Sequence, residues 1–242
     1  MIKMPTFKRC AWLMMSLLSG GPTLAGSFAV SPIRVELSMG TRTGVLSLRN
    51  ETDVETLVQV RAVQWSQLAD ADQLDDTNDL LVTPPIFKLP ARGEQILRVA
   101  IRREVDPALE LSYRLLIQEV PRVAAVDKPQ LTVALRISLP VFVAAVVRAQ
   151  PDLQWLAGWQ PDGSVRIEAQ NLGKAHMQIT DFDLQIGAVS APGASGSKYL
   201  LPGSRASWIV KAPSNVDHNA PITLRGHSDH GNIEARIALA GR

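Results

Sequence analysis

Residues 131–143, LTVALRISLPVFV, decide how this chain is interpreted. Every odd-numbered position in this stretch is apolar, whereas the even positions from Thr132 to Ser138 are small or polar. This period of two predicts a β-strand with one apolar face. The strand is long for a globular protein and carries a cation, Arg136, in its interior. Its apolar face therefore either fills the core of its own domain or offers side chains to another molecule.

The rest of the chain also alternates in short segments, with hardly any helical period. Strands are expected at 28–37, 44–48, 56–65, 80–85, 86–89, 95–101 and 111–120, and then at 165–169, 177–186, 199–201, 207–210, 222–224 and 233–239. Short strands at this spacing predict an all-β chain of two sandwiches, with a boundary near the Pro151-Asp152 turn. Residues 70–79 and 191–197 show no such period and are expected to be loops.

The first 25 residues are typical of a secretory signal. Lys3, Lys8 and Arg9 precede a short apolar run at 10–18, and Ala25 ends a stretch suited to signal peptidase. The apolar run is too short to span a bilayer. We therefore expect an exported chain that is not inserted in the membrane, with domains at 26–148 and 149–242.

Charge and cysteine content exclude several classes of function. Removing the three cations of the signal changes the formal charge from +2 to −1, so nothing points to a nucleic-acid partner. The single cysteine, Cys10, lies in the signal, so the exported chain would have neither a disulfide nor a thiol nucleophile. Core packing must then hold the domains together.

The histidines of the second half allow two further interpretations. His227, Asp229 and His230 could bind a metal, but their spacing matches no standard site. The same residues could form a hydrolase triad with a serine, but no Gly-x-Ser-x-Gly turn is present. A polar turn explains them best, and we expect neither a cofactor nor catalysis. Trp155, Trp159 and Trp208 are expected to be core or sheet-face aromatics.

Several motifs, in order along the chain, resemble those of the PapD-like periplasmic pilus chaperones. The resemblance covers the whole chain after the signal, and RISLPVF at 136–142 with the lack of cysteine is most similar to the archaic branch. The motifs are Val30-Ser31-Pro32-Ile33-Arg34 with Asn50 sixteen residues later, Thr83-Pro84-Pro85 with Leu89-Pro90 and Gly93, 113–121, 131–142, 171–176 and 201–204.

The resemblance implies two immunoglobulin-like β-sandwich domains in a boomerang arrangement. It also implies that the chain binds pilin-type subunits lacking a strand and delivers them to an outer-membrane usher. The donor strand would span 129–143, with Leu131, Val133 and Leu135 entering the subunit's open groove. A donor edge could also be covered by a second copy of the chain.

Two cations of the family bind the subunit's terminal carboxylate, which suits charge-assisted donors. Arg34 matches the first cation. The second, a lysine, aligns with Ser138, so Arg136 or Arg114 would have to replace it. Glu110 and Asp229 match the acids of an interdomain ion network, but the network's arginine aligns with Phe142. The family also has a cis bond between the two prolines of Thr83-Pro84-Pro85.

Two alternatives remain at this point. The chain could be an exported two-domain immunoglobulin-like binding or structural module, in which the odd face of 131–135 is simply core. It could also be an exported hydrolase that uses His230.

Overall fold

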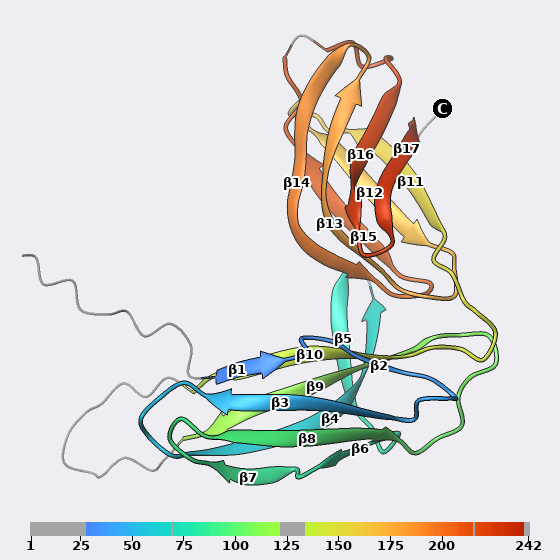
Figure 1. Ribbon diagram of the computed structural model, residues 1–242. Coiled ribbons are helices and arrows are strands. Elements are labelled where there is room, and N and C mark those ends of the chain that lie inside the picture. Colours follow the sequence, from blue (N-terminus) through green and yellow to red (C-terminus); the bar gives the residue numbers. More distant parts are fainter. Residues whose placement is uncertain (1–27, 69, 122–133, 215, 240–242) are drawn as a thin grey trace, which may run out of the picture.

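The computed structural model describes residues 28–68, 70–121, 134–214 and 216–239. Every helix or strand in these residues is a β-strand, which confirms the all-β prediction. Figure 1 shows two sandwiches set at an angle, joined by the chain that follows β10. Within the described residues there is no helix long and apolar enough to cross a membrane.

The first sandwich consists of two sheets around one apolar core. Alternation along each strand turns residues such as Leu48, Val58 and Leu115 into this core, where they are fully buried. One sheet has the order β1 (Phe28–Ser31), β3 (Thr43–Asn50), β8 (Glu94–Ile101), β6 (Leu80–Thr83). The other has the order β2 (Val35–Leu37), β10 (Arg136–Val143), β9 (Leu111–Val120), β4 (Thr56–Leu68), β5 (Ala71–Asp76), and β7 (Ile86–Leu89) also pairs with β4.

The second sandwich is a single seven-stranded sheet folded over its own core. Trp155 is buried in this core, and Trp159 and Trp208 pack against it, as the sequence predicted. The strand order is β14 (Val189–Leu200), β13 (Met177–Ile186), β16 (Ile222–Ser228), β17 (Gly231–Leu239), β11 (Leu153–Trp159), β12 (Val165–Asn171), β15 (Arg205–Val210). The chain changes from one sandwich to the other between Val143 and Leu153.

The first strand segment changes sheets and leaves part of β10 unpaired. β1 pairs with β3 in one sheet, whereas β2, three residues later, pairs with β10 in the other. β2 covers β10 only at Val141, Phe142 and Val143, while β9 pairs with β10 along its whole length. On the side away from β9, no described strand pairs with residues 136–140. This segment is therefore an open sheet edge.

Two expected loops are strands. Residues 71–76 form β5, which pairs with the far half of β4 in a hairpin. All six residues of β5 are exposed, so no buried face imposes an alternating pattern. Residues 191–197 lie within β14, an edge strand with bulges. There Gly193 approaches the Phe182 carbonyl so closely that a Cβ would clash with it, which explains the small residues.

The cis peptide bonds differ from the family pattern. Among the described residues they are Ser31-Pro32 and Thr83-Pro84. The bond expected to be cis from the family pattern, Pro84-Pro85, is not cis here. The cis bond lies one residue earlier, between Thr83 and Pro84.

Candidate functional site

The odd face of β10 belongs to the core of the first sandwich. Leu139 is 6% exposed, and Val141 and Val143 are fully buried. Ile137 packs against the same core from its margin. For these residues, the interpretation of the apolar face as the domain's own core is therefore correct.

Towards its beginning, the same strand leaves the core. Leu135 is half-buried, and its carbonyl still accepts a hydrogen bond from the Glu119 N–H at 3.0 Å. Two of the three predicted donor positions, Leu131 and Val133, lie outside the described residues. The backbone pairing with β9 thus runs to Leu135, at the start of the described segment.

The opposite face of β10 contacts the second sandwich around Phe142. Phe142 on β10 and Trp65 on β4 are both 2% exposed and form an apolar cluster with Leu201 and Tyr199. The Trp65 ring meets the Tyr199 ring edge-on at 5.3 Å and lies 6.0 Å from the Phe142 ring. Aromatic packing of this kind fixes the junction between the sandwiches.

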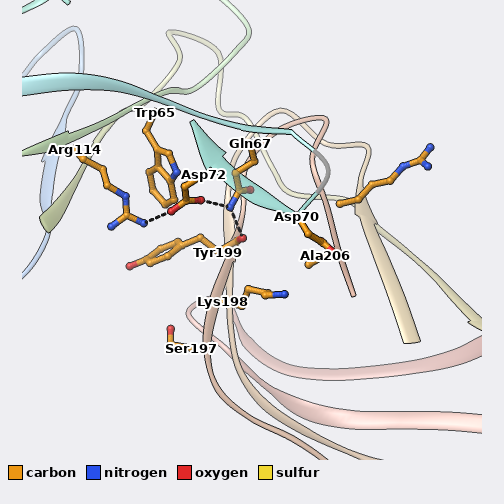
Figure 2. A pocket seen from close by; sticks show the side chains of 10 residues that line it. Trp65, Gln67, Asp70, Asp72, Arg114, Ser197, Lys198, Tyr199 and Ala206 are labelled. Carbon is orange, nitrogen blue, oxygen red and sulfur yellow. Dashed lines mark hydrogen bonds and ion pairs between the residues drawn. The ribbon is translucent and has the colours of Figure 1, made fainter. Parts of the chain in front are cut away.

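Arg114 lies in this cleft rather than on the surface. It is opposite Pro140, and its guanidinium lies 3.7 Å above the Trp65 ring. Nη2 contacts Asp72 Oδ2 at 3.3 Å, and Nη1 reaches the Ser138 hydroxyl at 3.5 Å. Burial lowers the pKa of Arg114, and Asp72 and Tyr199 oppose this effect. Figure 2 shows the chain of contacts from Arg114 through Asp72 to Gln67 beside Tyr199.

Arg34 lies between β1 and β2, at the other side of the cleft. Its Nη1 is 3.0 Å from Asp229 Oδ2 in the second sandwich, and its Nε is 3.0 Å from Glu36 Oε1. One third of the side chain remains exposed. Arg34 is thus held by an acid from each sandwich and is still open to solvent.

Arg34 and Arg114 lie on opposite sides of β10: Arg34 directly precedes Val35, which pairs with Val141, and Arg114 pairs with Pro140. Burial raises the pKa of Tyr199, while the positive charges of Arg34 and Arg114 and a hydrogen bond from Arg34 oppose that rise. Both positive charges therefore lower the pKa of Tyr199. Arg136, by contrast, lies exposed at the start of β10, opposite Gln118. Of the three predicted cations, Arg34 and Arg114 thus lie at the junction of the sandwiches, whereas Arg136 does not.

The two predicted interdomain acids meet through a histidine that the sequence reasoning did not identify. His176 Nδ1 lies 2.6 Å from Glu110 Oε1, and its backbone N–H donates to the same oxygen at 3.0 Å. His176 Nε2 lies 3.3 Å from Asp229 Oδ2, without the alignment of a good hydrogen bond. The imidazole is stacked on Phe142, with ring centroids 3.5 Å apart and planes 5° apart.

The pKa values of this network follow from its charges. Burial raises the pKa of Asp229, but His176, the Gln178 N–H donor and His230 outweigh burial and lower the pKa to about 2. For His176, burial lowers the pKa, but the contacts with Asp229 and Glu110 outweigh burial and raise it above its usual range. His176 thus lies between the two predicted acids, stacked on Phe142, and its pKa is raised by their charges. The only sequence signal was its place at the end of the 171–176 motif.

The β4–β5 hairpin makes a second contact between the sandwiches. The Gln67 side chain donates to the Tyr199 carbonyl at 3.0 Å and accepts from the Leu201 N–H at 3.0 Å. Asp70, at the hairpin turn, accepts a hydrogen bond from the Ser207 hydroxyl at 2.6 Å. Residues predicted to be a loop therefore help to fix the relative position of the two sandwiches.

His227 and His230 lie next to different carboxylates. His227 pairs with Asp181 at 2.8 Å on the surface, and His230 lies 4.0 Å from Asp229. Over the described ranges, no three His, Cys, Asp or Glu side chains are grouped so that they could hold a metal ion.

Comparison with known proteins identifies this architecture. Residues 27–144 match the family model described as "Pili and flagellar-assembly chaperone, PapD N-terminal domain". The probable fimbrial chaperone EcpB of Escherichia coli O157:H7 is 24% identical over 199 residues, covering 79% of this chain and 85% of that protein.

Solved structures share the fold over most of the chain. A chain of the CsuC–CsuE chaperone–tip adhesion subunit complex, from archaic Csu pili of Acinetobacter baumannii, is matched with a TM-score of 0.67 at 19% identity. The match covers 89% of this chain and 100% of that one. The SafA pilin–SafB chaperone complex of Salmonella enterica gives a TM-score of 0.59 at 18% identity, covering 89% and 99%.

Proposed function

We propose that this protein is a periplasmic chaperone for pilin-type subunits. It completes an unfinished subunit by lending it a strand, and it delivers the subunit to an outer-membrane usher. The first domain matches the family model of the PapD N-terminal domain of pili and flagellar-assembly chaperones. Both domains share the fold of solved pilus chaperones. The fold similarity to the Csu complex supports the archaic branch.

The open edge of β10 is the observation that carries this function. Residues 136–140 offer unpaired backbone groups on one side while β9 holds the other side in place. An added subunit strand would continue this sheet through main-chain hydrogen bonds. Leu131, Val133 and Leu135, the apolar odd positions of the sequence at the start of this segment, would provide the side chains for the subunit's groove.

Arg34 and Arg114 are the proposed anchor for the subunit's terminal carboxylate. They lie on opposite sides of β10 at the junction of the domains: Arg34 pairs with Asp229 of the second domain, and Arg114 lies over the ring of Trp65, which contacts Tyr199. Arg114 reaches the hydroxyl of Ser138, the position that aligns with the family's lysine. Arg136 lies two residues away, at the exposed start of the strand, so Arg114 is the better second cation.

The remaining assignments complete this proposal. Residues 1–25 are a cleaved signal, 26–148 form the first domain and 149–242 the second. The protein needs no cofactor and catalyses no reaction, because subunit folding itself provides the driving force. In the free protein, a second copy could cover the donor edge.

Co-purification from the periplasm tests the function. The chain would be expressed with a C-terminal tag together with the genes that neighbour its own. A stoichiometric small β-rich partner, unstable when expressed alone, is the expected result. A lone protein that stabilises no partner would instead support an immunoglobulin-like module without chaperone activity.

A further inference from the structure

His176 is the point where the two domains and the proposed anchor meet electrostatically. Its ring is 9% exposed and lies between Glu110 of the first domain and Asp229 of the second. Stacking on Phe142 fixes the ring plane, so the imidazole cannot turn away from either acid. A titratable group in such a position changes the charge of a buried junction within a physiological pH range.

His176 and Arg34 share one atom of Asp229. Oδ2 of Asp229 lies 3.3 Å from His176 Nε2 and 3.0 Å from Arg34 Nη1. The other oxygen, Oδ1, accepts from the Gln178 N–H at 2.9 Å. When His176 is neutral, Arg34 is the charged partner of Oδ2 among the described residues, and the His230 ring lies farther away, 4.0 Å from Oδ1. When His176 is protonated, the two cations share that carboxylate.

The surrounding charges make this difference matter. Glu36, Glu110 and Asp229 supply three carboxylates around His176, and Arg34 and Arg148 supply two guanidinium groups. Together these side chains carry a charge of −1 when His176 is neutral and of zero when His176 is protonated. A carboxylate ligand is therefore repelled less when His176 is protonated. The groups that face this space are Glu110, Asp229, Glu36, Arg34, Arg148, Tyr199 and His230.

We propose that protonation of His176 controls how strongly Arg34 binds a carboxylate, because protonated His176 takes over part of the charge of Asp229 that otherwise neutralises Arg34. His176 is then a positioning residue that acts through Asp229 and does not touch the ligand. This inference rests on the proposed anchor role of Arg34.

The direction of the pH dependence follows from the network. Burial lowers the pKa of His176, but its contacts with Asp229 and Glu110 raise it above the ordinary value of about 6.5. His176 is therefore protonated below that value and loses its proton as the pH rises through its own, higher pKa. Carboxylate binding should be strong in mildly acidic solution and weaken in alkaline solution.

Acetate serves as the simplest carboxylate probe. It would be titrated at constant ionic strength against chloride while NMR follows the Arg34 side-chain N–H and the His176 ring. As the pH rises from about 6 through the pKa of His176, we expect the affinity to fall about three- to tenfold. Because coupling is reciprocal, bound acetate should raise the pKa of His176 by the logarithm of the same factor.

Variants separate a charge role from a purely structural one. His176→Gln should bind acetate weakly at every pH, whereas His176→Arg should keep the strong binding and lose the pH dependence. His218→Gln is the matched control, because His218 is stacked on Trp159 on the second domain. It should behave like the unmodified protein.

The outcomes distinguish the two claims. Acetate that binds at Arg34 with one affinity across the pH range, or that leaves the pKa of His176 unchanged, would overturn the role of His176 and leave the anchor intact. Acetate that never perturbs Arg34, at any pH, would overturn the anchor and this inference with it. If a variant fails to fold, the acetate titrations of the unmodified protein alone still test the role of His176 and the anchor role of Arg34.

Discussion

The two ends of β10 carry the same sequence pattern and do different things. At Leu139, Val141 and Val143 the apolar face is sealed in the core of the first domain, and from Val141 onward β10 is paired on both sides, with β9 and with β2. At Leu135 and Ile137 the face emerges from the core, and one edge has no described partner. A single strand is thus anchored at one end, and we propose that its other end is available to a subunit.

The comparison shows how a chaperone could offer apolar side chains without losing its own stability. The buried end contributes several aliphatic side chains to the core, each of which stabilises the domain by about 1.5–3 kcal/mol. The other end can then be apolar for the benefit of a partner. Substitutions at matched positions can test this division.

Val141→Asp should have the largest effect. Val141 is fully buried, so the new carboxylate would have no water and no partner. We expect the first domain to lose more than about 3 kcal/mol, measured by urea unfolding. Near-normal stability would mean that this end of the strand is not core.

Val133→Asp is the same chemical change at the other end of the face. We expect the free energy of unfolding to change by less than about 0.5 kcal/mol, while the subunit complex is no longer recovered. Unfolding of the first domain would instead show that Val133 is core, and the donor assignment would be wrong.

Phe142→Ala tests the opposite face of the buried end. It removes the ring that supports His176 and packs near Trp65 and Tyr199. A loss of about 3 kcal/mol is expected, with weaker coupling between the domains in calorimetry. An unfolding profile identical to that of the unmodified protein would contradict the junction described here.

The pH dependence of stability tests the ion network next to that ring. Asp229 has a pKa of about 2, lower than its unfolded value of 3.8, so its stabilisation is present above about pH 4 and is lost as the pH falls towards 2. His176 has a raised pKa, so its contribution is present below about pH 6.5 and is lost as the pH rises through its folded pKa.

Stability should therefore be greatest between about pH 4 and about pH 6.5. Asp229→Asn should remove the acid-side loss, about 1–2 kcal/mol after allowing for partial exposure. An identical acid-side slope in both proteins, measured by denaturant unfolding at several pH values, would rule out this role of Asp229.

Arg136→Ala should have the smallest effect. The side chain is exposed at the open end of β10, so stability should change by less than about 0.5 kcal/mol and subunit recovery should persist. Arg34→Ala, with the fold intact, should abolish recovery. If Arg136→Ala instead abolishes recovery, Arg136 rather than Arg114 is the second anchor.

The sequence predicted the parts of the fold in which one face is buried. The strand predicted at 56–65 corresponds to the first ten residues of β4, in which buried and exposed residues alternate from Thr56 to Ala62. β5 was missed because all of its residues are exposed, and a strand without a buried face leaves no periodic signal. The small residues of β14 also leave no periodic signal. At Gly193 the small residue is required because the backbone lies close to the Phe182 carbonyl.

The site was only partly predictable. Glu110, Asp229 and Arg34 were found through their resemblance to family positions, and their proximity is now seen in the cleft. His176 was missed because its role depends on contacts with residues 66 and 53 positions away, which periodicity cannot reveal. The choice between Arg114 and Arg136 likewise required the register of β9 on β10.

Hydrogen exchange at residues 136–140 tests the central claim most directly. The free protein and its purified subunit complex would be compared amide by amide. We predict that amides directed to the open edge become strongly protected in the complex, while those paired with β9 are protected in both states. Equal exchange of the open-edge amides in both states would contradict strand donation, even if the two proteins bind.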